Sequence, residues 1–121
     1  MTDKGTVWIT SALAIETRPI RKRLSIDEAI HSPPLHFWCG VHQESGRRVG
    51  ILVTGMGETH VKHAIGHLRE RLAQAEAVLL VGGCGGLVPE LKVEDHLIPR
   101  KVFQISGQKL ILSAALVDIL E

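Results

Sequence analysis

"VLLVGGCGGLVPELKVEDHLIP", residues 78–99, is the stretch of sequence that decides the fold. Its first four residues continue an apolar run that begins at Ala77, and such a run predicts a β-strand over 77–81 that is covered on both faces. The strand leads into five residues of which four are glycine, residues 82–86. Glycines at this density indicate a turn where the backbone itself comes close to a ligand or to another segment.

Length and composition predict one globular domain over residues 1–121. The chain has 121 residues, of which 45% are hydrophobic and 22% charged, which is enough apolar content for one core. A net charge of +1 and an aromatic content of 3% argue against nucleic acid or an anionic membrane as a partner. The apolar runs are too short to span a bilayer and the N-terminus has no signal-peptide pattern, so we expect a cytoplasmic protein.

Strand and helix patterns alternate along the chain. Apolar and alternating runs predict strands over 7–12, 35–42, 48–54 and 77–81, with 35–42 and 48–54 as an antiparallel hairpin and 92–105 as two extended pieces separated at Pro99. Apolar residues at helical spacing predict helices over 15–24, 59–73 and 110–121, with a short helical turn over 25–34. In the first helix, Pro19 is acceptable because it falls near the first turn. The alternation of strands and helices along the chain predicts an α/β domain of three layers, a mixed β-sheet flanked by helices.

Two of the predicted strands end in glycine turns, "TGMG" at 54–57 and "GGCGG" at 82–86. In open α/β sheets, ligands bind at the carboxyl ends of strands, where both turns fall. Positive φ or tight packing explains any single glycine about as well, but two such turns together favour a ligand. A dinucleotide is disfavoured because His60 stands where the third glycine of G-x-G-x-x-G would be, and no P-loop motif occurs. We therefore expect no cofactor.

Three segments carry a resemblance to a known family: "SALAIE" at 11–16, "TGMG" at 54–57 and "VGGCGGLVPELKVEDHLIP" at 81–99. Together they resemble the purine nucleoside phosphorylase and nucleosidase superfamily, and within it the 5'-methylthioadenosine/S-adenosylhomocysteine nucleosidases. The resemblance runs from about residue 7 to residue 104. It implies a nucleoside phosphorylase-like fold and cleavage of the N-glycosidic bond of a purine nucleoside or its 5'-thio derivative, in nucleoside catabolism or salvage.

The resemblance also implies a set of site residues. The turn at 82–86 would pass beside the purine and ribose, Met56 would pack on the sugar side, and Glu16 would orient or deprotonate the attacking water. The residues implied to bind substrate are Ala12, Leu13, Met56, Gly83, Cys84 and Gly85. A carboxylate suits this reaction because it stabilises an oxocarbenium-like transition state while it activates water. Without the resemblance, Glu16 reads as a solvated residue at a helix start.

Water is favoured over phosphate as the nucleophile. The phosphorylases of this superfamily carry a Gly and an Arg after the first strand to hold phosphate, whereas "SALAIET" at 11–17 has no Gly there and Arg18 is out of that pattern. Phosphate stays open as a second partner. Hydrolysis is therefore the expected reaction.

The sequence departs from the family pattern towards its C-terminus. The family continues through a Met-Glu segment that holds the ribose hydroxyls and a Ser-Asp segment that protonates the purine, and neither occurs in this sequence. Glu94 also replaces the glycine expected before Asp95. The alternative to an enzyme is therefore an inactive or partial relative, a nucleoside-binding module or subunit. A sheet without its last strands leaves an open edge, so we expect a homodimer or a larger oligomer.

The remaining candidate sites have simpler explanations. His60, His63 and His67 share a helix face at a spacing that fits a metal ion, but no acid completes the set, so surface histidines are expected and no metal site. Cys39 and Cys84 lack a C-x-x-C partner, which predicts two reduced thiols, and no base stands beside Cys84 in the sequence. The basic residues at 18–23 read as a solvated helix face.

Overall fold

The computed structural model describes residues 5–84, 86–99, 101–106 and 109–115. The chain divides into two compact units, Met1–Cys84 and Gly85–Glu121. The expectation of one domain over 1–121 stays a prediction. None of the helices in the described part of the chain is long and apolar enough to cross a bilayer.

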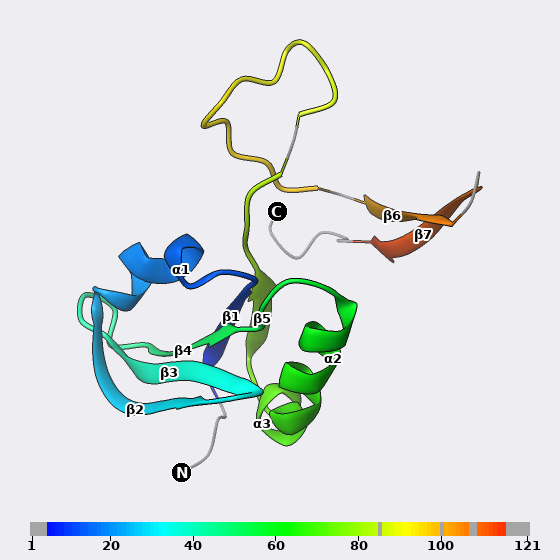
Figure 1. The fold of residues 1–121 in the computed structure, drawn as a ribbon. Helices are drawn as coiled ribbons and strands as arrows, with labels where there is room; N and C mark the ends of the chain where they lie inside the picture. Colours follow the sequence, from blue (N-terminus) through cyan, green and yellow to red (C-terminus); the bar gives the residue numbers. More distant parts are fainter. Residues whose placement is uncertain (1–4, 85, 100, 107–108, 116–121) are drawn as a thin grey trace. The chain divides into compact units, whose positions relative to one another are not determined.

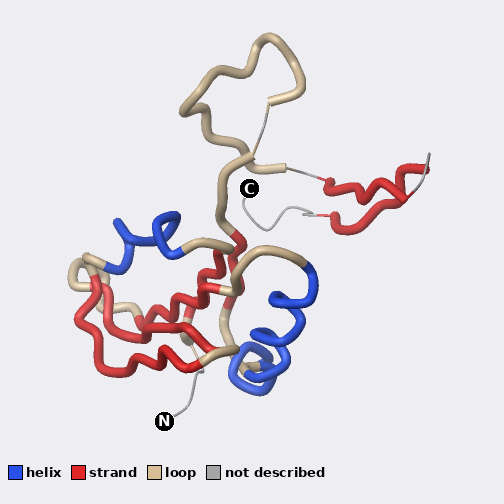
Figure 2. The backbone as a smooth tube through the Cα atoms, in the orientation of Figure 1, coloured by secondary structure: helices blue, strands red, loops and turns tan. Residues whose placement is uncertain are grey.

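A five-stranded mixed sheet forms the centre of the first unit, in the order β2-β3-β4-β1-β5 (Figures 1 and 2). The fourth strand in this order, β1, is parallel to both of its neighbours, β4 and β5, whereas β3 is antiparallel to both β2 and β4. The predicted mixed sheet and the predicted hairpin of β3 and β4 are confirmed. The strands are β1 (Val7–Ser11), β2 (Leu24–Ser32), β3 (Leu35–His42), β4 (Arg48–Val53) and β5 (Ala77–Leu80).

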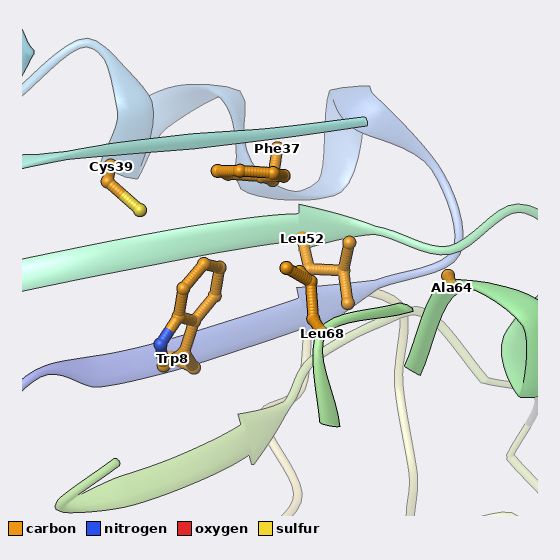
Figure 3. Close-up of a cluster of buried hydrophobic side chains, with 6 residues drawn as sticks. All are labelled: Trp8, Phe37, Cys39, Leu52, Ala64 and Leu68. Atoms are coloured by element: carbon orange, nitrogen blue, oxygen red, sulfur yellow. The ribbon is translucent and has the colours of Figure 1, made fainter. Parts of the chain in front are cut away.

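Helices cover both faces of this sheet, which gives the predicted three layers. On one face, Ile20 of α1 (Ala14–Arg21) packs against a cluster that includes Ile9 and Ile51. On the other face, Ala64 of α2 (Glu58–His67) and Leu68 before α3 (Arg69–Ala73) pack against side chains of β1, β3 and β4. Figure 3 shows this second cluster, which consists of Trp8, Phe37, Cys39, Leu52, Ala64 and Leu68.

The register of β1 against β4 places a glycine under the largest core side chain. Trp8 is the direct partner of Gly50, and a Cβ on Gly50 would lie 2.5 Å from Cε3 of the indole. Trp8 is fully buried and meets the edge of Phe37 with ring centroids 5.8 Å apart. Only glycine therefore lets β4 pass beneath the indole ring at this spacing.

The prediction of a helical turn over 25–34 is wrong, because these residues form most of β2. Pairing with β3 runs along the whole strand, from Leu24 opposite His42 to Ser32 opposite Leu35, with an irregularity between Ile26 and Glu28. The helix-favouring residues of "SIDEAIHS" are thus overridden by sheet pairing and by the burial of Leu24.

The helix prediction over 59–73 is correct in type but misses a break. Leu68 has φ −110° and ψ 12°, outside the helical region, and it separates α2 from α3. Of the predicted apolar stripe, Ala64 and Leu68 are buried, whereas Ile65 is 40% exposed. In α1, Pro19 is the sixth of eight residues and not in the first turn, and the helix ends two residues later.

The strand predicted over 77–81 is present as β5, but it is not covered on both faces. It pairs with β1 at one edge of the sheet, and its side chains are largely exposed, with Leu80 84% exposed. The prediction of burial on both faces is therefore wrong, because the helices of this unit pack over the inner strands.

The second unit contains a two-stranded antiparallel sheet of β6 (Lys101–Ser106) and β7 (Lys109–Ala115). The predicted helix over 110–121 is therefore wrong as far as residue 115, and residues 116–121 lie outside the described part. The run "KLILSAA" pairs with "KVFQIS", which favours the extended form. Residues 92–99 contain turns and no strand, so of the two predicted extended pieces only the second is confirmed.

Candidate functional site

Three parallel strands bring their carboxyl ends together at one edge of the sheet. Backbone bonds fix the loops that leave β1 and β4, because the Thr54 amide donates to the Ser11 carbonyl at 2.8 Å and the Gly55 amide to the Ala12 carbonyl at 3.1 Å. On the other side, the Val81 amide donates to the Thr10 carbonyl at 2.9 Å. The segments 11–13, 54–57 and 81–83 are therefore neighbours, as expected for a ligand site in an α/β sheet.

Glu16 lies at this meeting point, in the first turn of α1. Its Oε1 accepts a hydrogen bond from the Leu13 amide at 2.9 Å, and its Oε2 accepts one from the Gly83 amide at 3.0 Å. The first bond closes the start of the helix, as a glutamate at the third helical position commonly does. The second bond joins residues 67 positions apart and connects the "SALAIE" segment to the glycine turn after β5.

The two glycine residues next to Glu16 differ in their surroundings. A Cβ on Gly82 would lie 3.0 Å from Oε2 of Glu16, so a side chain there would press on the carboxylate. A Cβ on Gly83 would meet no atom within 4 Å. Glycine at 83 is therefore not required by packing within the protein, and the space beside it is open.

The turn after β4 requires glycine for its backbone shape. Gly55 and Gly57 have φ values of 83° and 95°, which residues with a side chain rarely adopt. Between them, the Met56 side chain is 69% exposed. Leu13, in the loop after β1, is 46% exposed, and Ala12 is half-buried. Leu13 and Met56 therefore both expose side-chain surface in the loops at the strand ends.

Most of the predicted site residues lie in loops that are connected by hydrogen bonds. Leu13, Glu16 and Gly83 are joined by hydrogen bonds, and the Ala12 carbonyl accepts one from Gly55, in the turn that contains Met56. Cys84 is exposed and ends the first unit. Gly85 lies outside the described residues, so its predicted contact with a nucleoside stays a prediction.

Sequence reasoning missed the hydroxyl groups that support the two loops. The buried Ser11 donates to the Leu13 carbonyl at 3.0 Å and lies 3.4 Å from the hydroxyl of the buried Thr17. Thr54 donates to the Gly55 carbonyl at 2.9 Å. Small hydroxyl residues directly after a buried strand are a recognisable signal for such bonds.

The histidines of α2 do not form a metal site in the described residues. His60 and His67 each use Nδ1 on a backbone carbonyl four residues earlier, that of Met56 at 2.9 Å and that of His63 at 2.8 Å. The basic residues of α1 are mostly solvated, but the guanidinium of Arg21 lies 4.4 Å from the ring centre of Trp38.

Comparison with known proteins finds one matching family model and several similar solved structures. The family model of the phosphorylase superfamily matches residues 6–113. No curated protein matches the chain significantly. Among solved structures, futalosine hydrolase of Helicobacter pylori is similar at 21% identity and a TM-score of 0.70, over 88% of this chain and 51% of its own.

Two further solved structures are 5'-methylthioadenosine/S-adenosylhomocysteine nucleosidases. The Neisseria meningitidis enzyme, in complex with methylthio-immucillin-A, is 24% identical with a TM-score of 0.61, over 73% of this chain and 37% of its own. A Helicobacter pylori variant with 5'-methylthioadenosine in the active site is 25% identical with a TM-score of 0.61, over 78% of this chain and 39% of its own.

The chain thus spans between 37% and 51% of the length of these solved structures. Their likeness shows the fold, and the match to the family model covers most of the sequence. The protein belongs to the phosphorylase superfamily.

Proposed function

We propose that this protein cleaves the N-glycosidic bond of a purine nucleoside or of its 5'-thio derivative, with water as the nucleophile and Glu16 as the group that activates it. The observation that carries the proposal is the position of the Glu16 carboxylate, which two backbone amides from separate loops hold at the strand ends. The open space beside Gly83 supports a ligand there. The nucleoside-type ligands named for similar structures support the substrate class.

The chemistry follows from what a held carboxylate can still do. An ionised carboxylate has about four lone-pair positions, and the two amides occupy one on each oxygen. The remaining positions can accept a proton from water while its oxygen attacks the sugar carbon. The carbon–nitrogen bond breaks as the carbon–oxygen bond forms, its electron pair leaves with the base, and the leaving base takes its proton from a separate acid or from solvent. The negative charge of Glu16 also stabilises the oxocarbenium-like transition state.

The other site residues have binding roles in this proposal. Gly83, Cys84 and Gly85 lie along the purine and ribose, Met56 packs on the sugar side, and Ala12 and Leu13 form the wall next to Glu16. Met56 and Leu13 suit such roles because both side chains are exposed in the protein without ligand. No cofactor is needed for this reaction, and its place is in nucleoside catabolism or salvage.

A specific observation favours the second candidate, a nucleoside-binding module or subunit without turnover. Breaking the bond also requires an acid that neutralises the leaving base. Of the carboxylates in residues 5–84, Asp27, Glu28, Glu58 and Glu76 are engaged in ion pairs with lysine or arginine rather than offered as an acid. A missing acid lowers the rate about tenfold for each 1.4 kcal/mol of lost transition-state stabilisation.

Base release from a panel of nucleosides separates these candidates. The panel contains methylthioadenosine, S-adenosylhomocysteine, adenosine and inosine, each with and without inorganic phosphate, and binding is measured in parallel by calorimetry. We expect release that needs no phosphate. Release that depends on phosphate would contradict water as the nucleophile. Binding without release of any base would establish the binding module, and a folded protein that binds none of the four would overturn both candidates.

A further inference from the structure

The one buried residue of α1 is a threonine. Thr17 is fully buried, whereas the other residues of the helix are half-buried or exposed. A helix position that faces the core is usually apolar, and a β-branched polar residue lowers the stability of a helix. A buried hydroxyl is also costly unless it forms a hydrogen bond. The contacts of the Thr17 hydroxyl should therefore explain why threonine stands at this position.

The partner of Thr17 is the hydroxyl of Ser11, the last residue of β1. Ser11 is fully buried too, and the two hydroxyl oxygens lie 3.4 Å apart. Ser11 donates its single proton to the Leu13 carbonyl at 3.0 Å, so Thr17 is the donor within the pair. The Thr17 hydroxyl also lies 3.5 Å from the Ala14 carbonyl. Its polar contacts thus all lead to the segment that begins α1.

The backbone of Leu13 connects this hydroxyl pair to Glu16. The Leu13 carbonyl accepts the Ser11 hydroxyl and also the Glu16 amide, the latter at 3.2 Å, while the Leu13 amide donates to Oε1 of Glu16 at 2.9 Å. The backbone carbonyl of Ser11 in turn accepts the Thr54 amide at 2.8 Å. A continuous series of hydrogen bonds therefore runs from the end of β4 through Ser11 and Leu13 to the carboxylate.

Thr17 also fixes the rotation of α1 about its own axis. Successive residues of an α-helix are turned by about 100°, so the direction in which Thr17 points determines that of its neighbour Glu16. With Thr17 directed at Ser11, Oε2 of Glu16 lies 3.0 Å from the Gly83 amide. A rotation of the helix that broke the hydroxyl contact would move the carboxylate away from this position.

We propose that the hydroxyls of Ser11 and Thr17 act as one unit that sets the direction of the Glu16 carboxylate, so that both are positioning residues for the hydrolysis. The inference rests on the proposed function, because it takes Glu16 as the group that activates water. Neither hydroxyl touches the nucleoside in this proposal, and both act through Glu16. Their removal should therefore lower kcat and leave substrate binding nearly unchanged.

The test replaces Thr17 by valine, which keeps the branched shape and removes the hydroxyl. For adenine release from methylthioadenosine, we expect Thr17→Val to lower kcat about ten- to hundredfold and to keep KM within about twofold. Thr17→Ser retains the hydroxyl and should keep kcat within about threefold of the unchanged protein. Ser11→Ala should lower kcat like Thr17→Val, and it provides the same test if the valine variant does not fold.

A control and a double-variant cycle separate positioning from a general structural effect. Thr6→Val makes the same change in another fully buried threonine, which stands before β1 at the end of the strand away from Glu16, and it should leave kcat unchanged. In the Glu16→Gln protein, adding Thr17→Val should not reduce the remaining rate further, because no carboxylate is left to position. A purely structural role would reduce the rate by the same factor with or without Glu16.

Each other outcome overturns the inference. An unchanged kcat in Thr17→Val would do so while leaving the proposed function intact, and so would an equal loss of rate in the presence and absence of Glu16. A raised KM at unchanged kcat would show that the hydroxyls shape the ligand site and not the direction of the carboxylate. Absence of base release by the unchanged protein would overturn the proposed hydrolysis together with the inference.

Discussion

At the scale of single residues, Gly82 and Gly83 allow the Glu16 carboxylate and the ligand space to be altered separately. In Gly82→Ala the new methyl group would press on Oε2 of Glu16 and weaken its bond to the Gly83 amide. We expect base release to fall by about one to two orders of magnitude, because small displacements of a reacting group are costly. Measurement of the initial rate decides this, and an unchanged rate would contradict the role of this contact.

Gly83→Ala tests the open space beside the turn. Because an added Cβ meets no protein atom within 4 Å, we expect the free energy of unfolding to change by no more than about 0.5 kcal/mol. The methyl group would occupy ligand space, so nucleoside affinity should fall. Gly66→Ala, where an added Cβ also meets nothing, is the control for affinity. A dissociation constant equal to that of the unchanged protein would contradict a ligand at Gly83.

His36 gives the fold a predictable pH dependence. Burial and neighbouring positive charge lower its pKa below the ordinary 6.5. As the pH falls through 6.5, the unfolded chain takes up this proton before the folded protein does, so stability decreases from neutral pH down to the lower folded value. His36→Gln should reduce this loss between about pH 7.5 and about pH 5.5 in urea titrations. The same loss in His36→Gln as in the unchanged protein would contradict this assignment, and His63→Gln serves as the control.

At the scale of elements, the pairing of β1 with β4 depends on the contact between Trp8 and Gly50. Gly50→Ala would place a Cβ at 2.5–2.7 Å from three atoms of the indole, so the strands or the ring must shift. We expect a loss of about 1–3 kcal/mol in the free energy of unfolding, the usual cost of overpacking. Urea denaturation measures it. Gly66→Ala is the control, because Gly66 has no positive φ and an added Cβ there meets no atom within 4 Å. Gly46→Ala would be a poor control because the φ of Gly46 is positive.

The fold could be predicted wherever a local pattern and the tertiary contacts agree. The apolar runs of β1, β4 and β5 and the alternation in β3 identify these strands from sequence alone. The segment 25–32 could not be identified, because its helix-favouring residues are extended only through pairing with β3. The same applies to β7, whose apolar run fits helix or strand until its partner β6 is known.

The sequence predicts which residues belong to the candidate site, but it does not predict the contacts between them. The glycine turns mark the strand ends, and the family resemblance indicates Glu16. That Glu16 and Gly83 share a hydrogen bond follows from the pairing of β1 with β5, which no local pattern reveals. A groove lined by His31, His36 and His60 was not predicted, because His31 stands in the segment whose sequence predicts a helical turn.

At the scale of the whole molecule, the expected homodimer stays a prediction. β5 lies at the edge of the five-stranded sheet, and its exposed Leu80 is suited to pairing with another chain. Sedimentation velocity should show a dimer or larger oligomer, and Leu80→Lys should shift it toward monomer because a lysine on an edge strand opposes pairing. Val93→Lys, an exposed apolar position outside the sheets, is the control. A monomeric unchanged protein would contradict the prediction.

The central claim is that the carboxylate of Glu16 activates water in a nucleoside site. Glu16 also caps α1, so its chemical role has to be separated from its structural one. Glutamine at this position keeps one acceptor oxygen, which can accept the hydrogen bond of the Leu13 amide, but its amide nitrogen cannot accept that of the Gly83 amide, and it cannot take a proton from water. Glu16→Gln should therefore keep the helix cap and lose the bond to the Gly83 amide, whereas Glu16→Ala should lose the cap as well as the activity.

The most direct measurement is the rate of phosphate-free adenine release from methylthioadenosine by Glu16→Gln, compared with the unchanged protein and with Glu44→Gln, an exposed carboxylate in the β3–β4 turn. We predict a fall of about 10²- to 10⁴-fold in Glu16→Gln and no change in Glu44→Gln, with similar nucleoside affinity in all three proteins. Release by Glu16→Gln at the rate of the unchanged protein would contradict the claim.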